Sequence, residues 1–430
     1  MRKRRRCEVA APRSVRSAQW WAQLGPGLVT GASDDDPSGI ATYSQAGARF
    51  GFGLLWSIVL TLPLMVAIQT VCAHVGNVTH RGLAANLAAM YPRSIVAAAA
   101  ALLLAANLFN IAADLNAMAD CMRLLVGGPT LVYVIGFGIA SLLLQLYAMY
   151  RSYVRVLKWL TLSLFAYVAA MLMIHVPWRD VGLAVIRPPW QISREYLTAI
   201  VAIFGTTISP YMFFWQASHE VERAKERGEQ GRKLRKPEAV EQFRRIRLDT
   251  WVGMALSNLI AFCIMVTTAV VLHAHGKTDV QTTAQAAQAL EPVAGRLALS
   301  LFALGIVGTG LIALPVLAGS AGFAIADTFG WRTGLNHMPQ QARAFYAVIG
   351  VAMLGGVMLC LIKLDPIQAL YWSAVINGIV AVPIMALLMS VAQRSAVMGK
   401  FPVRGALKWG GWSATAAMTA VVLAMLVMMF

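Results

Sequence analysis

The sequence predicts an all-α polytopic membrane protein of about eleven transmembrane helices, built from two inverted repeats of five helices with helices 1 and 6 broken. Hydrophobic residues make up 58% of the 430 residues and charged residues only 13%, whereas a soluble chain carries about 25% charged residues. The apolar segments are about 17–25 residues long, which suits membrane-crossing helices, while the strands of membrane barrels are about half that length. Proline interrupts two of these segments beside short polar side chains.

The first helix, expected from about Leu24 to Phe50, contains the run Asp34-Asp35-Asp36-Pro37-Ser38-Gly39. One charge at bilayer depth costs about 2.5–3.5 kcal/mol, so three in a row need compensation. Pro37 disfavours the α conformation at Asp36, and Gly39 tolerates φ > 0, so we expect unwinding from Asp36 to Gly39. Unwound backbone inside a membrane must be buried in protein or line a polar cavity. A break that carries acidic side chains and free carbonyl oxygens favours a cation. The alternative is a kinked helix start with solvated acids at the membrane interface.

The remaining apolar segments follow at intervals along the chain. They are expected to form helices at about 54–75, 95–121, 130–149, 154–176, 195–221, 249–273, 296–320, 342–362, 367–392 and 406–430. We therefore divide the chain into a basic tail (1–20), a first repeat (21–176), a second repeat (195–392) and a final helix (405–430). Inside the second repeat, the highly charged segment 222–248 lacks apolar periodicity, which predicts a solvated, partly helical loop.

Basic residues dominate the charge, which is formally +17 at pH 7. They cluster in the tail and in the segment 222–248, between apolar spans. With the N-terminus in the cytoplasm, most Lys and Arg of the connections lie inside, so the positive-inside rule favours this orientation and places the C-terminus outside. We expect a multi-pass protein of the cell (inner) membrane whose basic stretches contact anionic lipid of the bilayer and bind no nucleic acid. The oligomeric state stays open, and a monomer is compatible with this architecture.

Catalytic and metal-cluster motifs are missing from the sequence. It contains no Walker A, HExxH or Ser/His/Asp set. The five cysteines are scattered without CxxC spacing, so they predict neither disulfides nor a zinc site. We expect no enzyme activity and no cofactor.

The sixth helix contains a second break, at Ser209-Pro210. It lies five spans after the first, and because five is odd, the second set of helices starts from the opposite side of the membrane. Interrupted helices at corresponding positions of two inverted halves indicate a central substrate site. A coincidental proline kink is the alternative.

Hard oxygen ligands are expected where the two breaks meet. Asp36 offers a carboxylate, the backbone near Ser33 and Thr206 offers carbonyl oxygens, and Ser209 offers a hydroxyl. This donor set suits Mg²⁺, Mn²⁺ or Ca²⁺ and suits copper poorly. Asp34 and Asp35 are assigned to the path or its support, and one of them could line the path and concentrate cations by its field.

These residues resemble the Nramp family of divalent metal transporters over most of the chain. The matching motifs are Gly25-Pro26-Gly27, Asp36-Pro37, Ala41-Thr42, Gln45-Ala46-Gly47-Ala48, Phe50-Gly51, Ala73-His74-Val75-Gly76, Leu83-Ala84, Tyr91-Pro92-Arg93 and Asp114-Leu115. The resemblance implies a 5+5 inverted repeat of the leucine-transporter type, with the transported metal held between helices 1 and 6. It also implies proton-coupled uptake of Mn²⁺ or Fe²⁺.

Several site positions depart from the family pattern. Gly39 stands at the usual asparagine, Ser209 at the methionine and Tyr211 at the histidine. Losing the thioether removes a preference for transition metals, and losing the asparagine enlarges the site for an ion that keeps its water, such as Mg²⁺. Ala374 stands at the usual glutamine, so Asn377 is a possible replacement.

Proton coupling is also in question. Tyr211 and Ala117 occupy the positions of the family's proton-relaying histidine and glutamate. A tyrosine has a pKa of about 10, and alanine does not titrate. Asp114, in the third helix, could line the path or pair with a neighbouring helix.

The resulting hypothesis is uptake of partly hydrated Mg²⁺ without proton coupling, as in the Nramp-related magnesium transporters that this pattern resembles. Asp36 would be the charge partner, and Ser209 and the Thr206 region would supply neutral ligands. Gly39 would leave room for water. The alternatives are a proton-coupled Mn²⁺/Fe²⁺ symporter and an organic-solute (amino acid) symporter in which Asp36 holds an amine or sodium.

Overall fold

A computed structural model describes residues 31, 34–147, 164–191, 193–228, 235–335, 338–362 and 365–429. Within these ranges the chain is helical, without a β-strand, which confirms the all-α class. The helices are α3 (Pro37–Phe50), α4 (Leu55–Thr79), α5 (Leu83–Ala88), α6 (Arg93–Val126), α7 (Thr130–Tyr147), α9 (Phe165–Met173), α10 (Trp178–Ile186), α11 (Arg194–Thr207), α12 (Pro210–Glu226), α13 (Lys236–Val271), α14 (Thr283–Ala287), α15 (Glu291–Ala294), α16 (Ala298–Phe329), α17 (Arg343–Leu359), α18 (Pro366–Ala392), α19 (Ser395–Met398) and α20 (Gly405–Met429).

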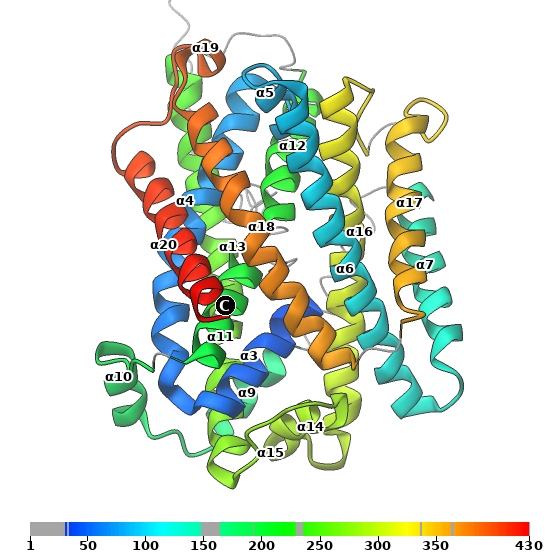
Figure 1. Ribbon diagram of the computed structural model, residues 1–430, viewed down its shortest axis with the longest axis vertical. Coiled ribbons are helices and arrows are strands. Elements are labelled where there is room, and N and C mark those ends of the chain that lie inside the picture. The colour runs from blue at the N-terminus through cyan, green and yellow to red at the C-terminus, as the bar shows by residue number, and fades with distance from the viewer. Residues whose placement is uncertain are drawn as a thin grey trace, which may run out of the picture.

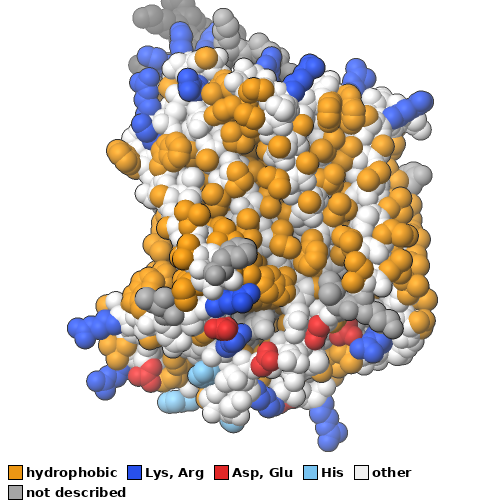
Figure 2. Space-filling model, viewed as in Figure 1, with side chains coloured by type: hydrophobic (Ala, Val, Ile, Leu, Met, Phe, Trp, Pro, Cys, Tyr) orange, Lys and Arg blue, Asp and Glu red, His pale blue; other side chains and the backbone are white. Residues whose placement is uncertain are grey.

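Seven helical segments of the described chain are long and apolar enough to cross a membrane, and the sharply bent pair α9 and α10 forms an eighth candidate. Shorter apolar helices, α7 and α17, stand at two further predicted spans. The first half of the predicted helix 1 and residues 148–163 lie outside the described residues. Figure 2 shows hydrophobic side chains over the middle of the molecule and charged side chains gathered toward its two ends, as a membrane protein requires.

The broken sixth helix forms the centre of the bundle. In the span that contains α11 and α12, 94% of an apolar stretch of 18 residues is buried inside the protein. The corresponding share in α20, at the periphery, is 28%. α11 packs against α18 and α3, and α12 packs against α4 and α16. Figure 1 shows α5 and α19 at one end of the bundle and α10, α14 and α15 at the other. The break therefore lies inside protein, where irregular backbone is tolerated.

The first helix breaks slightly earlier than the sequence predicts. Asp36 is extended, with φ −71° and ψ 169°, and α3 begins at Pro37. Gly39 lies inside the helix, so the expected unwinding through Gly39 is wrong. Proline suits the first position of a helix because it has no amide hydrogen to leave unpaired.

The charged segment 222–248 mainly extends two helices. α12 continues to Glu226 and α13 begins at Lys236, while residues 229–234 lie outside the described part of the chain. Within this segment Arg245 on α13 reaches back to Glu220 on α12, with Nη2 2.6 Å from Oε2. Both side chains are largely buried, at 11% and 1% exposure.

Candidate metal site

Asp36 caps the N-terminus of α3 with one carboxylate oxygen. Its Oδ1 accepts hydrogen bonds from Ser38 Oγ at 2.6 Å and from the amide of Gly39 at 2.8 Å. An acidic side chain at this position satisfies a free amide and interacts favourably with the helix dipole. The cap also explains why the helix starts so early, because it occupies the Gly39 amide that unwinding would have released.

The second oxygen of Asp36 faces two other helices. Its Oδ2 accepts from Asn110 Nδ2 on α6 and from the Tyr211 hydroxyl on α12, each at 3.3 Å. Asp36, Asn110 and Tyr211 are at most 1% exposed. The two breaks are therefore joined through Asp36, and the pairing of helix 1 with helix 6 that the sequence predicted is present.

Asn110, which the sequence analysis did not single out, contacts the carboxylate of Asp36. The Oδ1 of Asn110 accepts from Asn377 Nδ2 on α18 at 3.4 Å. Asn377 is fully buried, and its Oδ1 has no hydrogen-bond partner within the described residues. The available signal was the spacing of Asn110 and Asp114, four residues apart in an apolar helix and so on one face.

Gly39 lets α3 approach α11 closely. A Cβ at Gly39 would stand 3.2 Å from Thr206 Oγ1 and 3.4 Å from Tyr43 Cε2. The room for water that the sequence reading expected at Gly39 is therefore filled by these side chains. The same contact places the Thr206 hydroxyl beside the start of α3.

Ser209 turns its hydroxyl back onto the end of α11. Its Oγ lies 2.7 Å from the carbonyl oxygen of Gly205 and 2.9 Å from that of Thr206. Pro210 cannot donate to the Thr206 carbonyl because it lacks an amide hydrogen, so the serine hydroxyl replaces that donor. The lone pairs of Ser209 Oγ are the part of this side chain that a cation could use.

The other two acids of the first break lie against α13. Ser257 Oγ is 2.6 Å from Asp34 Oδ2 and 3.0 Å from Asp35 Oδ1. All three side chains are buried. A hydroxyl has one hydrogen and can donate it to only one of these oxygens. Ser33, the remaining predicted ligand, lies outside the described residues.

Asp114 lies one turn beyond Asn110 on α6. It is fully buried, and neither carboxylate oxygen has a hydrogen-bond partner in the described part of the chain. Of the two predicted roles, pairing with a neighbouring helix finds no partner among the described residues.

The described residues contain no group of three His, Cys, Asp or Glu side chains that could hold a metal ion. Asp36 is accompanied instead by amide, hydroxyl and carbonyl groups. A site with one carboxylate and neutral oxygens holds a hard divalent cation less tightly than a cage of carboxylates does. This composition suits an ion in transit, which has to leave again.

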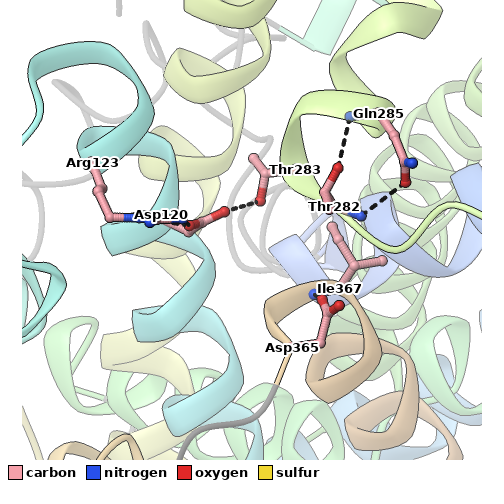
Figure 3. Close-up of polar contacts among 7 residues, drawn as sticks. All are labelled: Asp120, Arg123, Thr282, Thr283, Gln285, Asp365 and Ile367. Carbon is pink, nitrogen blue, oxygen red and sulfur yellow. Dashed lines mark hydrogen bonds and ion pairs between the residues drawn. The ribbon is translucent and has the colours of Figure 1, made fainter.

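The end of the bundle that carries α14 is tied to α6. Figure 3 shows Thr283, at the start of α14, pointing to Asp120 of α6, with 2.7 Å between Oγ1 and Oδ2. Asp120 also pairs with Arg123, with Oδ1 2.6 Å from Nη2. Thr282 and Gln285 form a capping box that sets the start of α14. α14 also contacts α16 and α3, so it lies over this end of the helices that form the site.

Known proteins match the chain over nearly its whole length. A family model described as natural resistance-associated macrophage protein-like matches residues 27–428. The divalent metal cation transporter MntH of Klebsiella pneumoniae (strain 342) is 26% identical over 379 residues, which are 86% of this chain and 85% of that protein. The protein of the same name from Klebsiella pneumoniae subsp. pneumoniae is 24% identical over 96% of this chain and 95% of its own.

Solved structures share the fold. A manganese transporter of Eremococcus coleocola, in complex with an aromatic bis-isothiourea substituted compound, superposes with a TM-score of 0.75 at 18% identity, covering 98% of this chain and 88% of its own. Mhp1, a nucleobase-cation-symport-1 family transporter in a closed conformation, reaches 0.54 at 14% identity, covering 94% and 90%. These likenesses confirm the leucine-transporter-type fold that the family resemblance implied. The chain belongs to the Nramp family of divalent metal cation transporters, in which the metal is the substrate and neither an enzyme activity nor a cofactor is involved.

Proposed function

We propose that this protein moves partly hydrated Mg²⁺ across the cell membrane, without proton coupling, through the site between α3, α6, α11, α12 and α18. The observation that carries the proposal is the set of groups around Asp36. Asn110 and Tyr211 hold its second oxygen, and neither sulfur nor imidazole is among its hydrogen-bond partners in the described chain. Oxygen donors are the ligands that Mg²⁺ prefers, whereas softer transition metals gain more from sulfur and imidazole ligands. A site built from oxygen donors therefore favours Mg²⁺.

The proposal that protons are not coupled rests on Tyr211 and Ala117. The Tyr211 hydroxyl donates to Asp36 and stays protonated at neutral pH, and Ala117 on α6 carries no exchangeable proton. Neither side chain can alternate between protonated and deprotonated forms during a transport cycle.

We propose uptake into the cytoplasm, and we use the positive-inside rule to assign which end of the bundle faces the cytoplasm. We place the end with α5 and α19 in the cytoplasm, together with the N-terminus, and the end with α14 and α15 outside. Mg²⁺ enters from the α14 side, meets Asp36 between the two breaks, and leaves to the cytoplasm by movement of one helix bundle against the other.

Reconstitution in proteoliposomes tests this function. Uptake of Mg²⁺ and of Mn²⁺ is measured separately, with a pH-sensitive dye inside the vesicles. We expect saturable Mg²⁺ uptake without acidification, and loss of flux in Asp36→Ala because the carboxylate that lies between the two breaks is gone. Uptake of Mn²⁺ but not Mg²⁺, together with acidification, contradicts the proposal.

The second candidate is proton-coupled Mn²⁺ symport, which the names of the relatives favour. It predicts internal acidification that depends on Mn²⁺ and disappears in Asp36→Ala. An organic-solute symporter predicts instead that amino acids compete for uptake and that Mg²⁺ and Mn²⁺ do not. The same vesicles distinguish all three functions.

A further inference from the structure

We propose that Asn110 is a further residue of the cation site, which donates to Asp36 through its amide nitrogen in the arrangement that the structure shows and turns its carbonyl oxygen to the ion when a cation binds. The inference rests on the proposed transport of a divalent cation through Asp36. It adds a ligand group from α6, a helix that the sequence reading placed beside the path.

The carboxylate of Asp36 is saturated with hydrogen bonds from the protein. It accepts four hydrogen bonds, from Ser38 and Gly39 on Oδ1 and from Asn110 and Tyr211 on Oδ2. A carboxylate offers about four lone-pair sites. A cation, or a water of its hydration shell, must therefore displace one donor. The contacts to Oδ2 are the longest, at 3.3 Å, so one of these two is released.

Asn110 is the donor with an alternative arrangement. In the structure its Nδ2 faces Asp36 and its Oδ1 accepts from Asn377 Nδ2, which leaves Asn377 Oδ1 without a partner in the described chain. If both amides turn over, Asn110 presents Oδ1 toward Asp36 and donates Nδ2 to Asn377 Oδ1. Each arrangement keeps one hydrogen bond between the amides. A bound cation favours the second, because it repels an N–H dipole and attracts a carbonyl oxygen.

Burial strengthens the dependence of the two amide arrangements on the bound ion. Asp36, Asn110 and Asn377 are at most 1% exposed, so no bulk water competes for their polar atoms. A buried carbonyl oxygen without a donor is costly. When both amides turn, Asn377 Oδ1 gains a donor and its Nδ2 loses an acceptor, so the pair of asparagines has no strong preference of its own and the ion decides between the two arrangements.

Substitutions at Asn110 test the proposal, with Asn107 as the matched control. Asn107 is one turn earlier on α6 and also fully buried, but it donates to α16, to the Leu317 carbonyl at 2.8 Å and to Ser320 Oγ at 2.9 Å. The readouts are the apparent Kd from the ion-dependent rise in melting temperature in detergent, and the KM for uptake in vesicles.

We expect Asn110→Leu to raise Kd and KM for Mg²⁺ about tenfold, equivalent to about 1.4 kcal/mol. Asn110→Ser, which is too short to reach both partners and cannot clash, is expected to do the same if the leucine variant fails to fold. Asn110→Asp, which presents only oxygens, is expected to bind at least as tightly as the wild type. Asn107→Leu should lower the melting temperature without ion but leave Kd unchanged.

Two results would overturn the proposal. One is a wild-type Kd in both Asn110→Leu and Asn110→Ser, and the other is equal weakening by Asn107→Leu. Weaker binding by Asn110→Asp would overturn the carbonyl part. A wild type that carries Mn²⁺ but not Mg²⁺ would refute the proposed Mg²⁺ preference instead, and the Asn110 comparison would then be made with Mn²⁺.

Discussion

Ser209 supports the backbone of the break and, in the proposed site, would also contact the ion. Its hydroxyl lies within hydrogen-bonding distance of the Gly205 carbonyl and of the Thr206 carbonyl, and Pro210 leaves the Thr206 carbonyl without a backbone donor. A methionine, which the family usually has here, could not make these hydrogen bonds but would offer a polarisable sulfur. The residue at this position therefore sets both the geometry of the break and the softness of its ligands.

Ser209→Met is expected to shift the preference toward Mn²⁺ relative to Mg²⁺ by about tenfold, the order of effect seen when groups around a metal site change. The measurement is the ratio of kcat/KM values for the two ions in vesicles. Ser390→Met is the matched control, because Ser390 also donates back to its own helix, to the Ala386 carbonyl at 2.8 Å, but lies near the end of α18. An unchanged ratio in Ser209→Met would show that this side chain is not a ligand.

At the scale of elements, α11 and α18 are held close enough for their backbones to touch. A Cβ at Gly205 would stand 2.0 Å from the Ala374 carbonyl oxygen and 2.5 Å from the Gly378 nitrogen. Gly205 lies one turn before the break, and Gly378 follows Asn377 directly. The contact between the two glycines therefore places Asn377 of α18 beside the end of α11, close to the break.

Gly205→Ala is expected to lower the stability by about 1–3 kcal/mol or more, because backbone atoms cannot move aside as side chains do. The matched control is Gly136→Ala in the exposed helix α7, where a Cβ would meet nothing within 4 Å; it should gain about 0.5–1 kcal/mol. Melting temperatures in detergent check both. Equal effects of the two substitutions would contradict the close contact.

The charged ends of α12 and α13 are joined by the buried pair of Glu220 and Arg245. Removing one partner leaves the other charge buried, so Arg245→Met is expected to cost about 3–5 kcal/mol. The double variant Glu220→Gln with Arg245→Met should recover part of that loss, since no uncompensated charge remains. Thermal unfolding of both variants measures the difference. A double variant less stable than Arg245→Met would show that the pair does not act as a unit.

At the scale of the whole molecule, the proposed uncoupled transport would make the membrane potential the driving force. Moving one elementary charge through 100 mV is worth about 2.3 kcal/mol, so a divalent ion gains about 4.6 kcal/mol. A potassium diffusion potential, negative inside, should accelerate Mg²⁺ uptake, and a potential of opposite sign should suppress it. A pH gradient alone should change nothing. Asp36→Ala vesicles control for leakage, and uptake that follows the pH gradient instead would establish proton coupling.

The helical class, the positions of the described spans and the two interrupted helices could all be predicted from sequence. Their signals are local: apolar stretches of membrane length, charged boundaries, and prolines next to polar residues. Asp36 could be singled out for the same reason, because a carboxylate inside an apolar span has to be compensated wherever the chain folds.

The neighbours of Asp36 could be identified only from the tertiary structure. Asn110, Tyr211 and Asn377 come from three different helices, and their hydrogen bonds depend on helix packing across the bundle. The space expected at Gly39 is taken by Thr206 and Tyr43 for the same reason, since nothing near Gly39 in the chain indicates which helix will lie against it. Composition and periodicity show which side chains of a segment must be buried or paired. The residues that pair with them lie far apart in the chain, so only the packing of the helices determines which ones they are.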